Sequence, residues 1–274
     1  MIKHFIDLEW KQYFRSSYWQ KSIAINILMV FFALYFVAMF LGLGFGLLFI
    51  LKKAFPDQDA FIIANGFLFY WIIGDLLMRF FLQKLPVMSV KPLLTLPIKR
   101  ATVVNYVLGK SVVSFFNFLP LFAIIPFSIM LIRDGYPTSM VLTWMLTMII
   151  VVLIINFLNF IIEAVSAKTE LSFLPLIVVV GALFGLDYFD ILPMKSLIGD
   201  SFISIANNPI LLVIPLAILA MCYGYNFKIL KGKLFLDSSL KSKVTEVNAS
   251  DLSWTKRFGD IAPFMQLDLK LIWR

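Results

Sequence analysis

The chain has 274 residues, of which 61% are hydrophobic and only 15% are charged, and its formal net charge at pH 7 is +8. Soluble globular domains carry about 25% charged residues, so this composition indicates a membrane protein and leaves little room for a soluble catalytic domain. The single histidine, His4, excludes a site that needs two histidines, and the single cysteine, Cys222, excludes an internal disulfide. The cations lie between apolar segments, where the anionic cytoplasmic leaflet accounts for them, so we expect no binding to nucleic acid.

The first predicted elements are an amphipathic lead and a long apolar helix. Residues 1–22 place aromatic side chains and cations at roughly helical spacing, which favours a helix lying in the membrane interface; an ordinary juxtamembrane lead is the alternative. Residues 23–51 carry no charge and exceed the roughly 20 residues that a helix needs to span a bilayer. Because this run and its lead are both longer than those of a cleaved signal peptide, we expect a retained first span.

Five further apolar segments complete the prediction of an all-α membrane protein, a six-helix transmembrane bundle within residues 23–230. The second to sixth expected spans are residues 60–82, 103–132, 140–162, 171–186 and 210–227. Residues 231–260 are polar and basic with little apolar periodicity, and are predicted to be a cytoplasmic linker.

The distribution of lysine and arginine predicts the orientation of the spans. If the N-terminus is cytoplasmic, the inside segments carry 18 of the 24 cations and the outside loops carry four. Cytoplasmic loops of membrane proteins are enriched in these residues, so both termini are expected inside the cell.

The end of the chain is similar to its beginning. Residues 264–274 align with residues 5–15, with identical Phe, Leu, Lys and Arg at four positions. Chance similarity between amphipathic segments is one explanation. The other is that residues 261–274 start a second repeat, which would make the chain the first half of a duplicated protein.

The connection between the second and third spans combines prolines, cations and apolar side chains. The apolar side chains need burial against the membrane or another protein, and burial of each is worth about 1.5–3 kcal/mol. The run Pro97-Ile98-Lys99-Arg100 resembles the cytoplasmic coupling helix in permease subunits of ABC-2-type transporters, although Lys99 stands where Ser is more usual. An ordinary basic loop is the alternative. By this resemblance, the residues that would contact an ATPase partner are Leu93, Leu94, Leu96, Pro97, Ile98, Lys99 and Arg100.

The layout of the chain also resembles that family, which joins its fifth and sixth spans by a partly re-entrant external segment; residues 187–209 would fill this place. The resemblance implies the transmembrane subunit of an ABC-type exporter in the bacterial inner membrane, without catalytic residues, metal or directly bound cofactor. It further implies a separate nucleotide-binding subunit that binds ATP, and a homodimer or a pairing with a second similar half. The chain itself offers only Gly109-Lys110-Ser111 of a P-loop, because the glycine required five positions earlier is Val104.

Three charged side chains lie within the predicted spans, where charges are costly and usually pair or line a cavity. Asp75 and Arg79 are i, i+4 neighbours on one helix face, and Lys110 lies near the cytoplasmic end of the third span. A structural ion pair of Asp75 with either cation is the favoured interpretation, and a proton or substrate path is the alternative. Such a path would make the chain an ion-coupled secondary transporter, and a non-transporting membrane scaffold is a further alternative.

Two other groups of residues point to helix packing. Asn156 and Asn159, three residues apart, are interpreted as side chains that hold helices together by hydrogen bonds. Gly42, Gly44 and Gly46 predict a place in the first span where another helix approaches closely or where the span flexes.

Overall fold

The computed structural model describes residues 23–83, 99–166, 173–189 and 191–233, together with residue 11. The chain divides into two units, Met1–Phe227 and Lys228–Arg274, and the contacts discussed below belong to the first. Several expectations lie outside the described residues: the amphipathic lead apart from residue 11, the coupling residues 93–98, nearly all of the linker, and the repeat at 261–274.

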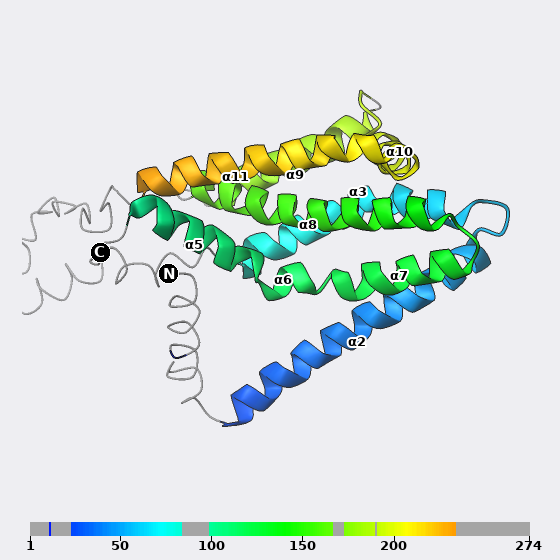
Figure 1. The fold of residues 1–274 in the computed structure, drawn as a ribbon, viewed down its shortest axis with the longest axis horizontal. Coiled ribbons are helices and arrows are strands. Elements are labelled where there is room, and N and C mark those ends of the chain that lie inside the picture. Colours follow the sequence, from blue (N-terminus) through cyan, green and yellow to red (C-terminus); the bar gives the residue numbers. More distant parts are fainter. Residues whose placement is uncertain (1–10, 12–22, 84–98, 167–172, 190, 234–274) are drawn as a thin grey trace, which may run out of the picture. The chain divides into compact units, whose positions relative to one another are not determined.

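Every secondary-structure element in these ranges is helical (Figure 1). Five segments among the described residues are long and apolar enough to cross a membrane: Ile27–Ala54, Ala60–Leu82, Phe115–Arg133, Thr138–Ser166 and Pro209–Gly232. The helices that form them are α2 (Ile23–Ala54), α3 (Ala60–Leu82), α6 (Phe115–Phe118), α7 (Leu121–Arg133), α8 (Thr138–Ser166), the 3-10 helix η2 (Pro209–Leu212) and α11 (Val213–Lys233). Their lengths and compositions are those of a multi-pass membrane protein, and the predicted all-α class is confirmed.

The third expected span, residues 103–132, is wrong as a continuous helix. The chain instead forms α5 (Arg100–Val112), α6 and α7, and the residues between α5 and α6 are non-helical, with Ser114 extended at φ −100° and ψ 145°. Pro120 contributes to the interruption before α7 because it has no N–H to bond the carbonyl four residues earlier. The apolar pattern runs unbroken across these interruptions, so hydropathy alone does not reveal them.

The fifth expected span is the short helix α9 (Leu174–Tyr188), and a separate helix, α10 (Met194–Asn207), follows it. Fifteen residues span about 22 Å, less than the roughly 30 Å of a hydrocarbon core. The expected external segment 187–209 is therefore mostly helical in its second half. α10 packs on α3 and α8, and Gly199 faces the backbone of α3, since a Cβ there would be at van der Waals contact, 3.4 Å, from the Asn65 backbone.

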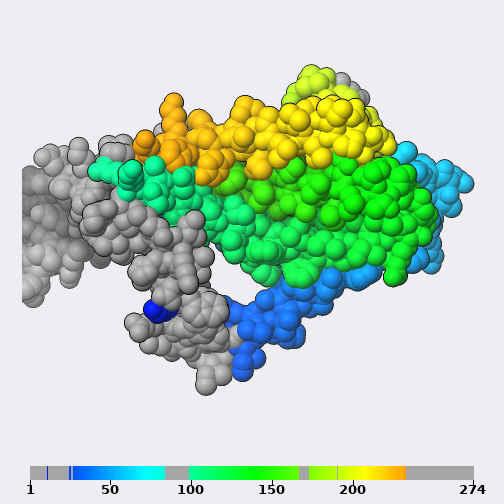
Figure 2. All heavy atoms as spheres, viewed as in Figure 1, coloured from blue at the N-terminus to red at the C-terminus, as the bar shows by residue number. Residues whose placement is uncertain are grey.

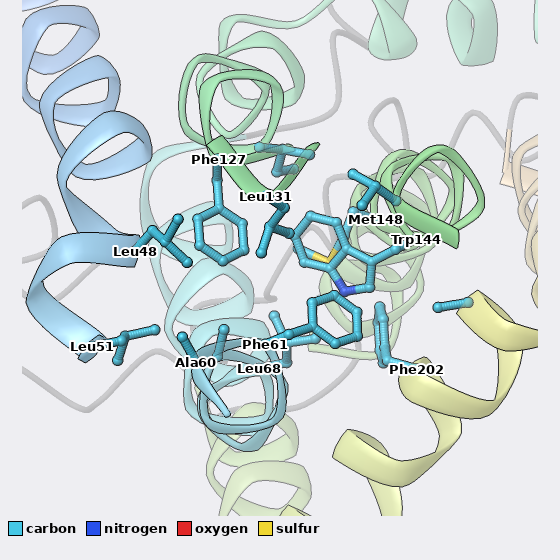
Figure 3. Close-up of a cluster of buried hydrophobic side chains, with 14 of the residues drawn as sticks. Leu48, Leu51, Ala60, Phe61, Leu68, Phe127, Leu131, Trp144, Met148 and Phe202 are labelled. Atoms are coloured by element: carbon cyan, nitrogen blue, oxygen red, sulfur yellow. The ribbon is translucent and has the colours of Figure 1, made fainter. Parts of the chain in front are cut away.

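A hydrophobic core joins α2, α3, α7, α8 and α10 near the Asp59 end of α3 (Figure 3). Trp144 of α8 lies at its centre, with ring centroids 5.9 Å from Phe61 and 5.6 Å from Phe127. The C-terminal half of α2 contributes Leu48 and Leu51. The rest of α2 lies at the edge of the bundle, where its apolar side chains form an outer surface (Figure 2). Such a surface is suited to contact with lipid.

Candidate functional site

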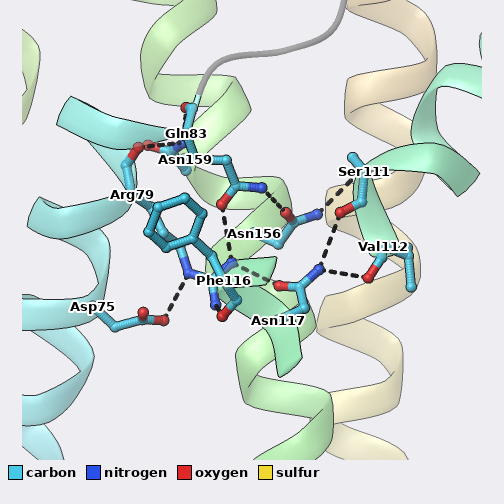
Figure 4. Close-up of polar contacts among 9 residues, drawn as sticks. All are labelled: Asp75, Arg79, Gln83, Ser111, Val112, Phe116, Asn117, Asn156 and Asn159. Atoms are coloured by element: carbon cyan, nitrogen blue, oxygen red, sulfur yellow. Dashed lines mark hydrogen bonds and ion pairs between the residues drawn. The ribbon is translucent and has the colours of Figure 1, made fainter. Parts of the chain in front are cut away.

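A network of polar side chains connects α3, α5, α6 and α8 at the break between α5 and α6 (Figure 4). Arg79 of α3 is its centre and is fully buried. Its Nε donates to Asp75 Oδ2 at 2.8 Å, its Nη1 to Gln83 Oε1 at 3.1 Å and Asn117 Oδ1 at 2.6 Å, and its Nη2 to Phe116 O at 2.7 Å. A buried guanidinium requires such partners because desolvation of an unpaired charge is costly.

The network satisfies backbone groups that the helix interruptions leave without their usual partners. Pro120 cannot donate to Phe116 O, and Arg79 Nη2 takes that place. Asn117 Nδ2 donates to the carbonyls of the last two residues of α5, at 3.1 and 2.9 Å. Non-helical backbone within a membrane protein is tolerated where the protein itself supplies such partners. The Arg79 network therefore stabilises the interruption between α5 and α6.

Two buried asparagines of α8 join the network from the other side. Asn156 Oδ1 accepts from Gln83 Nε2 at 2.6 Å, and Asn156 Nδ2 donates to Ser111 Oγ at 3.3 Å. Asn159 Nδ2 donates to the backbone oxygens of Arg79 and Gln83, at 3.4 and 3.2 Å. These contacts give partners to carbonyls at the C-terminal end of α3. Asn159 Oδ1 is the one buried side-chain acceptor of this network without a hydrogen-bond partner among the described residues.

The structure brings together two of the three predicted intramembrane charges. Asp75, whose side chain is 11% exposed, forms its ion pair with Arg79. Lys110 lies in the last turn of α5 and is half-buried. The two asparagines predicted to hold helices together also lie in the network, where they bond α3 and α5.

Of the predicted coupling residues, the structure describes two, Lys99 and Arg100. Lys99 is the N-cap of α5 and Arg100 its first residue, and both are exposed. The other five lie outside the described residues. The two described residues of the predicted coupling segment are thus the beginning of α5.

Sequence reasoning missed three members of the network: Gln83, Ser111 and Asn117. Each is a polar residue within or at the edge of an apolar run, which is the signal that could have found them. The signal is weak because a single Ser or Asn is tolerated in an ordinary span.

A second set of contacts joins the α2–α3 and α7–α8 loops at the opposite end of α3. Asp59 Oδ1 accepts from Phe61 N at 2.7 Å, which caps α3, and from the Tyr136 hydroxyl at 2.7 Å. Nearby, Lys52 in the last turn of α2 forms an ion pair with Asp134, the C-cap of α7. Burial, together with the hydrogen bond and charge of the Asp59 carboxylate, raises the pKa of Tyr136 to about 12. Within the described ranges, no three His, Cys, Asp or Glu side chains group so that they could hold a metal ion.

Comparison with known proteins assigns the chain to a family. The family described as "Family of unknown function (DUF5687)" matches residues 9–274. No curated protein and no solved structure matches the chain significantly. The match covers nearly the whole chain and assigns no function, so a functional proposal has to come from the residues.

Proposed function

We propose that this chain, which belongs to the DUF5687 family, is the transmembrane permease subunit of an ABC-type exporter. A separate ATPase subunit would drive the exporter. The observation that carries this proposal is that the segments on both sides of residues 84–98 are bonded to the Arg79 network. Gln83, directly before the loop, bonds Arg79 and Asn156. The helix after the loop, α5, ends in the same network at Ser111. A displacement of the loop would therefore reach the network from two sides.

In the proposed mechanism, α5 is a lever between the loop and the helix break. It has 13 residues, about 20 Å in length, and ends at the non-helical pair Val113 and Ser114. ATP binding on the partner moves the coupling residues and turns α5 about this pair. The hydrogen-bond partners of Asn117 and Arg79 then change, and this change shifts α7 relative to α3. Tyr223 of α11, whose hydroxyl donates to Asn105 Oδ1 at 2.8 Å, transmits the motion of α5 to α11.

The proposal includes six crossings of the bacterial inner membrane, with both termini in the cytoplasm. Leu176, in the first turn of α9, packs with Leu76 and Ile162 near the network end of α3 and α8. Phe184, two turns later, makes an edge-to-face contact with Phe69, with ring centroids 5.6 Å apart, nearer the Asp59 end of α3. α9 therefore runs along α3 from one end toward the other, and α10 would complete the crossing. The excess of cations in the segments taken as cytoplasmic supports the same topology.

The two alternatives make different demands on the network. An ion-coupled secondary transporter would use Asp75, Arg79 or Lys110 to bind an ion or substrate. Arg79 is fully buried and donates four hydrogen bonds within the protein, which favours a structural role for it. A non-transporting scaffold would need no coupled ATPase, so the partner discriminates between this alternative and the proposal.

The test is a double substitution in the coupling loop, Leu94→Asp with Ile98→Asp. Two carboxylates cannot enter an apolar groove on a partner without a large desolvation cost. The variant should insert and express normally but lose association with an ATPase subunit and lose ATP-dependent transport. Copurification of a P-loop ATPase with the tagged full-length chain from native membranes measures the association.

Two further variants control this experiment. Ser238→Asp with Ser239→Asp adds the same two charges to the cytoplasmic tail and should retain the ATPase. Asn117→Leu leaves the loop intact but removes the contact with the end of α5, so it should retain the ATPase and uncouple ATP hydrolysis from transport. If the Leu94→Asp, Ile98→Asp variant copurifies its ATPase at normal yield, the assignment of the coupling loop is wrong.

A further inference from the structure

An apolar cavity of about 270 Å³ lies between α2, α3, α7 and α8. All fourteen residues that line it are apolar. Its inner wall includes Leu68, Phe127, Trp144 and Met148, whose side chains lie close to one another in Figure 3. The cavity is separate from the Arg79 network, and none of the network's polar side chains lines it.

The packing of α2 explains why this space exists. A Cβ at Gly44 would lie 2.5 Å from Ala123 O and 2.9 Å from Ala123 Cα, so α2 and α7 touch backbone to backbone at this point. α2 packs extensively on α7 and much less on α3. The cavity occupies the space beside this contact, with α2 and α3 on its two sides.

The cavity opens sideways, toward the apolar outer surface. Leu43 of α2 and Phe67 of α3 line it and are 46% and 48% exposed. Ala64 and Trp144 line its inner part and are 7% and 3% exposed. The mouth therefore lies where the exposed apolar side chains of α2 and α3 would meet the hydrocarbon of the bilayer.

The lining surface is almost entirely apolar, so it offers a water molecule too few hydrogen-bond partners. The N–H of the Trp144 ring already donates to Asn65 Oδ1 at 2.9 Å. An internal water needs 2–4 polar partners, and purely apolar cavities of about 150 Å³ stay dry and take up benzene. This cavity is larger and open to an apolar phase, so hydrocarbon is the chemistry that suits it.

We propose that the cavity binds one acyl chain of a membrane phospholipid, which enters between Leu43 and Phe67. A chain that moves from the bilayer into the cavity gains no hydrophobic transfer energy, since both environments are apolar. The gain is the dispersion contact that the cavity walls otherwise lack. This inference does not depend on the proposed ATPase partner.

The test uses the fluorescence of Trp144 as a reporter. The full-length chain, with its other five tryptophans replaced by phenylalanine, is reconstituted into phosphatidylcholine vesicles with or without bromine atoms on the acyl chains. One of the five, Trp71, also lines the cavity, and phenylalanine keeps an aromatic ring at that place in the wall. Bromine quenches an indole only at close contact, and Trp144 is buried in the bundle. We expect brominated phospholipid to quench Trp144.

Substitutions in the cavity show whether the quenching comes from an acyl chain inside it. Ala64→Leu fills the inner part and should abolish the quenching, whereas Ala38→Leu, an equal change at an exposed position of α2, should leave it intact. Leu43→Phe narrows the mouth at an exposed position and should reduce the quenching even if Ala64→Leu does not fold. Thermal unfolding of each variant verifies folding.

Three outcomes would overturn the proposal. They are absence of quenching by brominated phospholipid, quenching that neither Ala64→Leu nor Leu43→Phe reduces, and quenching by a brominated free fatty acid in detergent but not by the phospholipid. The last outcome would identify a site for free amphiphiles instead of a membrane lipid.

Discussion

Replacing Arg79 by methionine would test the network directly, because this one side chain holds both α3 and the break before α6. Methionine keeps an apolar stem and removes all four donated hydrogen bonds. It also leaves the Asp75 carboxylate unpaired at 11% exposure, and leaves Phe116 O without its side-chain donor. Asp75→Asn is the matched control, because asparagine keeps an oxygen that can accept from Arg79 Nε.

The expected magnitudes follow from the number of contacts that each change removes. Side-chain hydrogen bonds in membrane proteins average about 0.6 kcal/mol, so the four bonds of Arg79 together contribute roughly 2–3 kcal/mol. Removing one partner of a buried ion pair typically costs about 3–5 kcal/mol in total. We therefore expect Arg79→Met to lower the free energy of unfolding by about 3–5 kcal/mol. Asp75→Asn keeps an acceptor for Arg79 Nε but removes the counter-charge of the buried guanidinium, so its cost should lie between that of one weakened hydrogen bond, about 1 kcal/mol, and that of a broken ion pair.

The assay is unfolding by sodium dodecyl sulfate in mixed micelles, applied to the wild type, both single variants and a double-mutant cycle of Asp75→Leu with Arg79→Met. Asp75→Leu leaves the guanidinium unpaired, so the cycle should report favourable coupling between the two residues. The double variant should remain destabilised, because it also loses the contacts of Arg79 with Asn117 and Phe116. Greater destabilisation by Asp75→Asn than by Arg79→Met, or a coupling energy of zero, would refute this account of the network.

Three further predictions concern the helix packing, the loop contacts and the topology. Gly44→Ala should lower the free energy of unfolding by about 1–3 kcal/mol through overpacking, while Gly42→Ala, with nothing within 4 Å of the added methyl, should not. Equal effects of the two substitutions on the free energy of unfolding would contradict the close α2–α7 contact. The contribution of Tyr136 to stability should be complete below pH 10 and lost as pH rises through about 12, so Tyr136→Phe should remove that loss in unfolding titrations. In a Cys222→Ser background, Lys195→Cys should react with an impermeant thiol reagent in intact cells and Lys91→Cys only after permeabilisation; the reverse pattern would invert the topology.

The sequence predicts α3 with its observed ends because local signals mark both of them. Asp59 is a good N-cap and its side chain does cap the helix, while the apolar run stops at Gln83. The ion pair of Asp75 with Arg79 was also among the expected pairings, since i, i+4 spacing fixes the two side chains on one face.

The break before α6 could not be predicted from the sequence because its partners are distant along the chain. Val113 and Ser114 would be compatible with a continuous helix. Their non-helical conformation is accompanied by side-chain hydrogen bonds to the backbone on either side of them, from Asn117 to Val112 O and from Arg79 to Phe116 O. The fifth span was likewise drawn from hydropathy, which does not distinguish a short apolar helix such as α9 from one long enough to cross the bilayer alone.

The separation of Arg79 from Asn117, 38 residues along the chain, has a consequence for biosynthesis. At synthesis rates of about 5–20 residues per second, α3 emerges from the ribosome roughly 2–8 s before Asn117 does. During that interval the guanidinium has partners only within its own segment, Asp75 one turn before it and Gln83 one turn after it. These two side chains can therefore bond the guanidinium before the residues of α6 have been synthesised. Their loss should therefore impair insertion of the nascent chain as well as the stability of the finished protein.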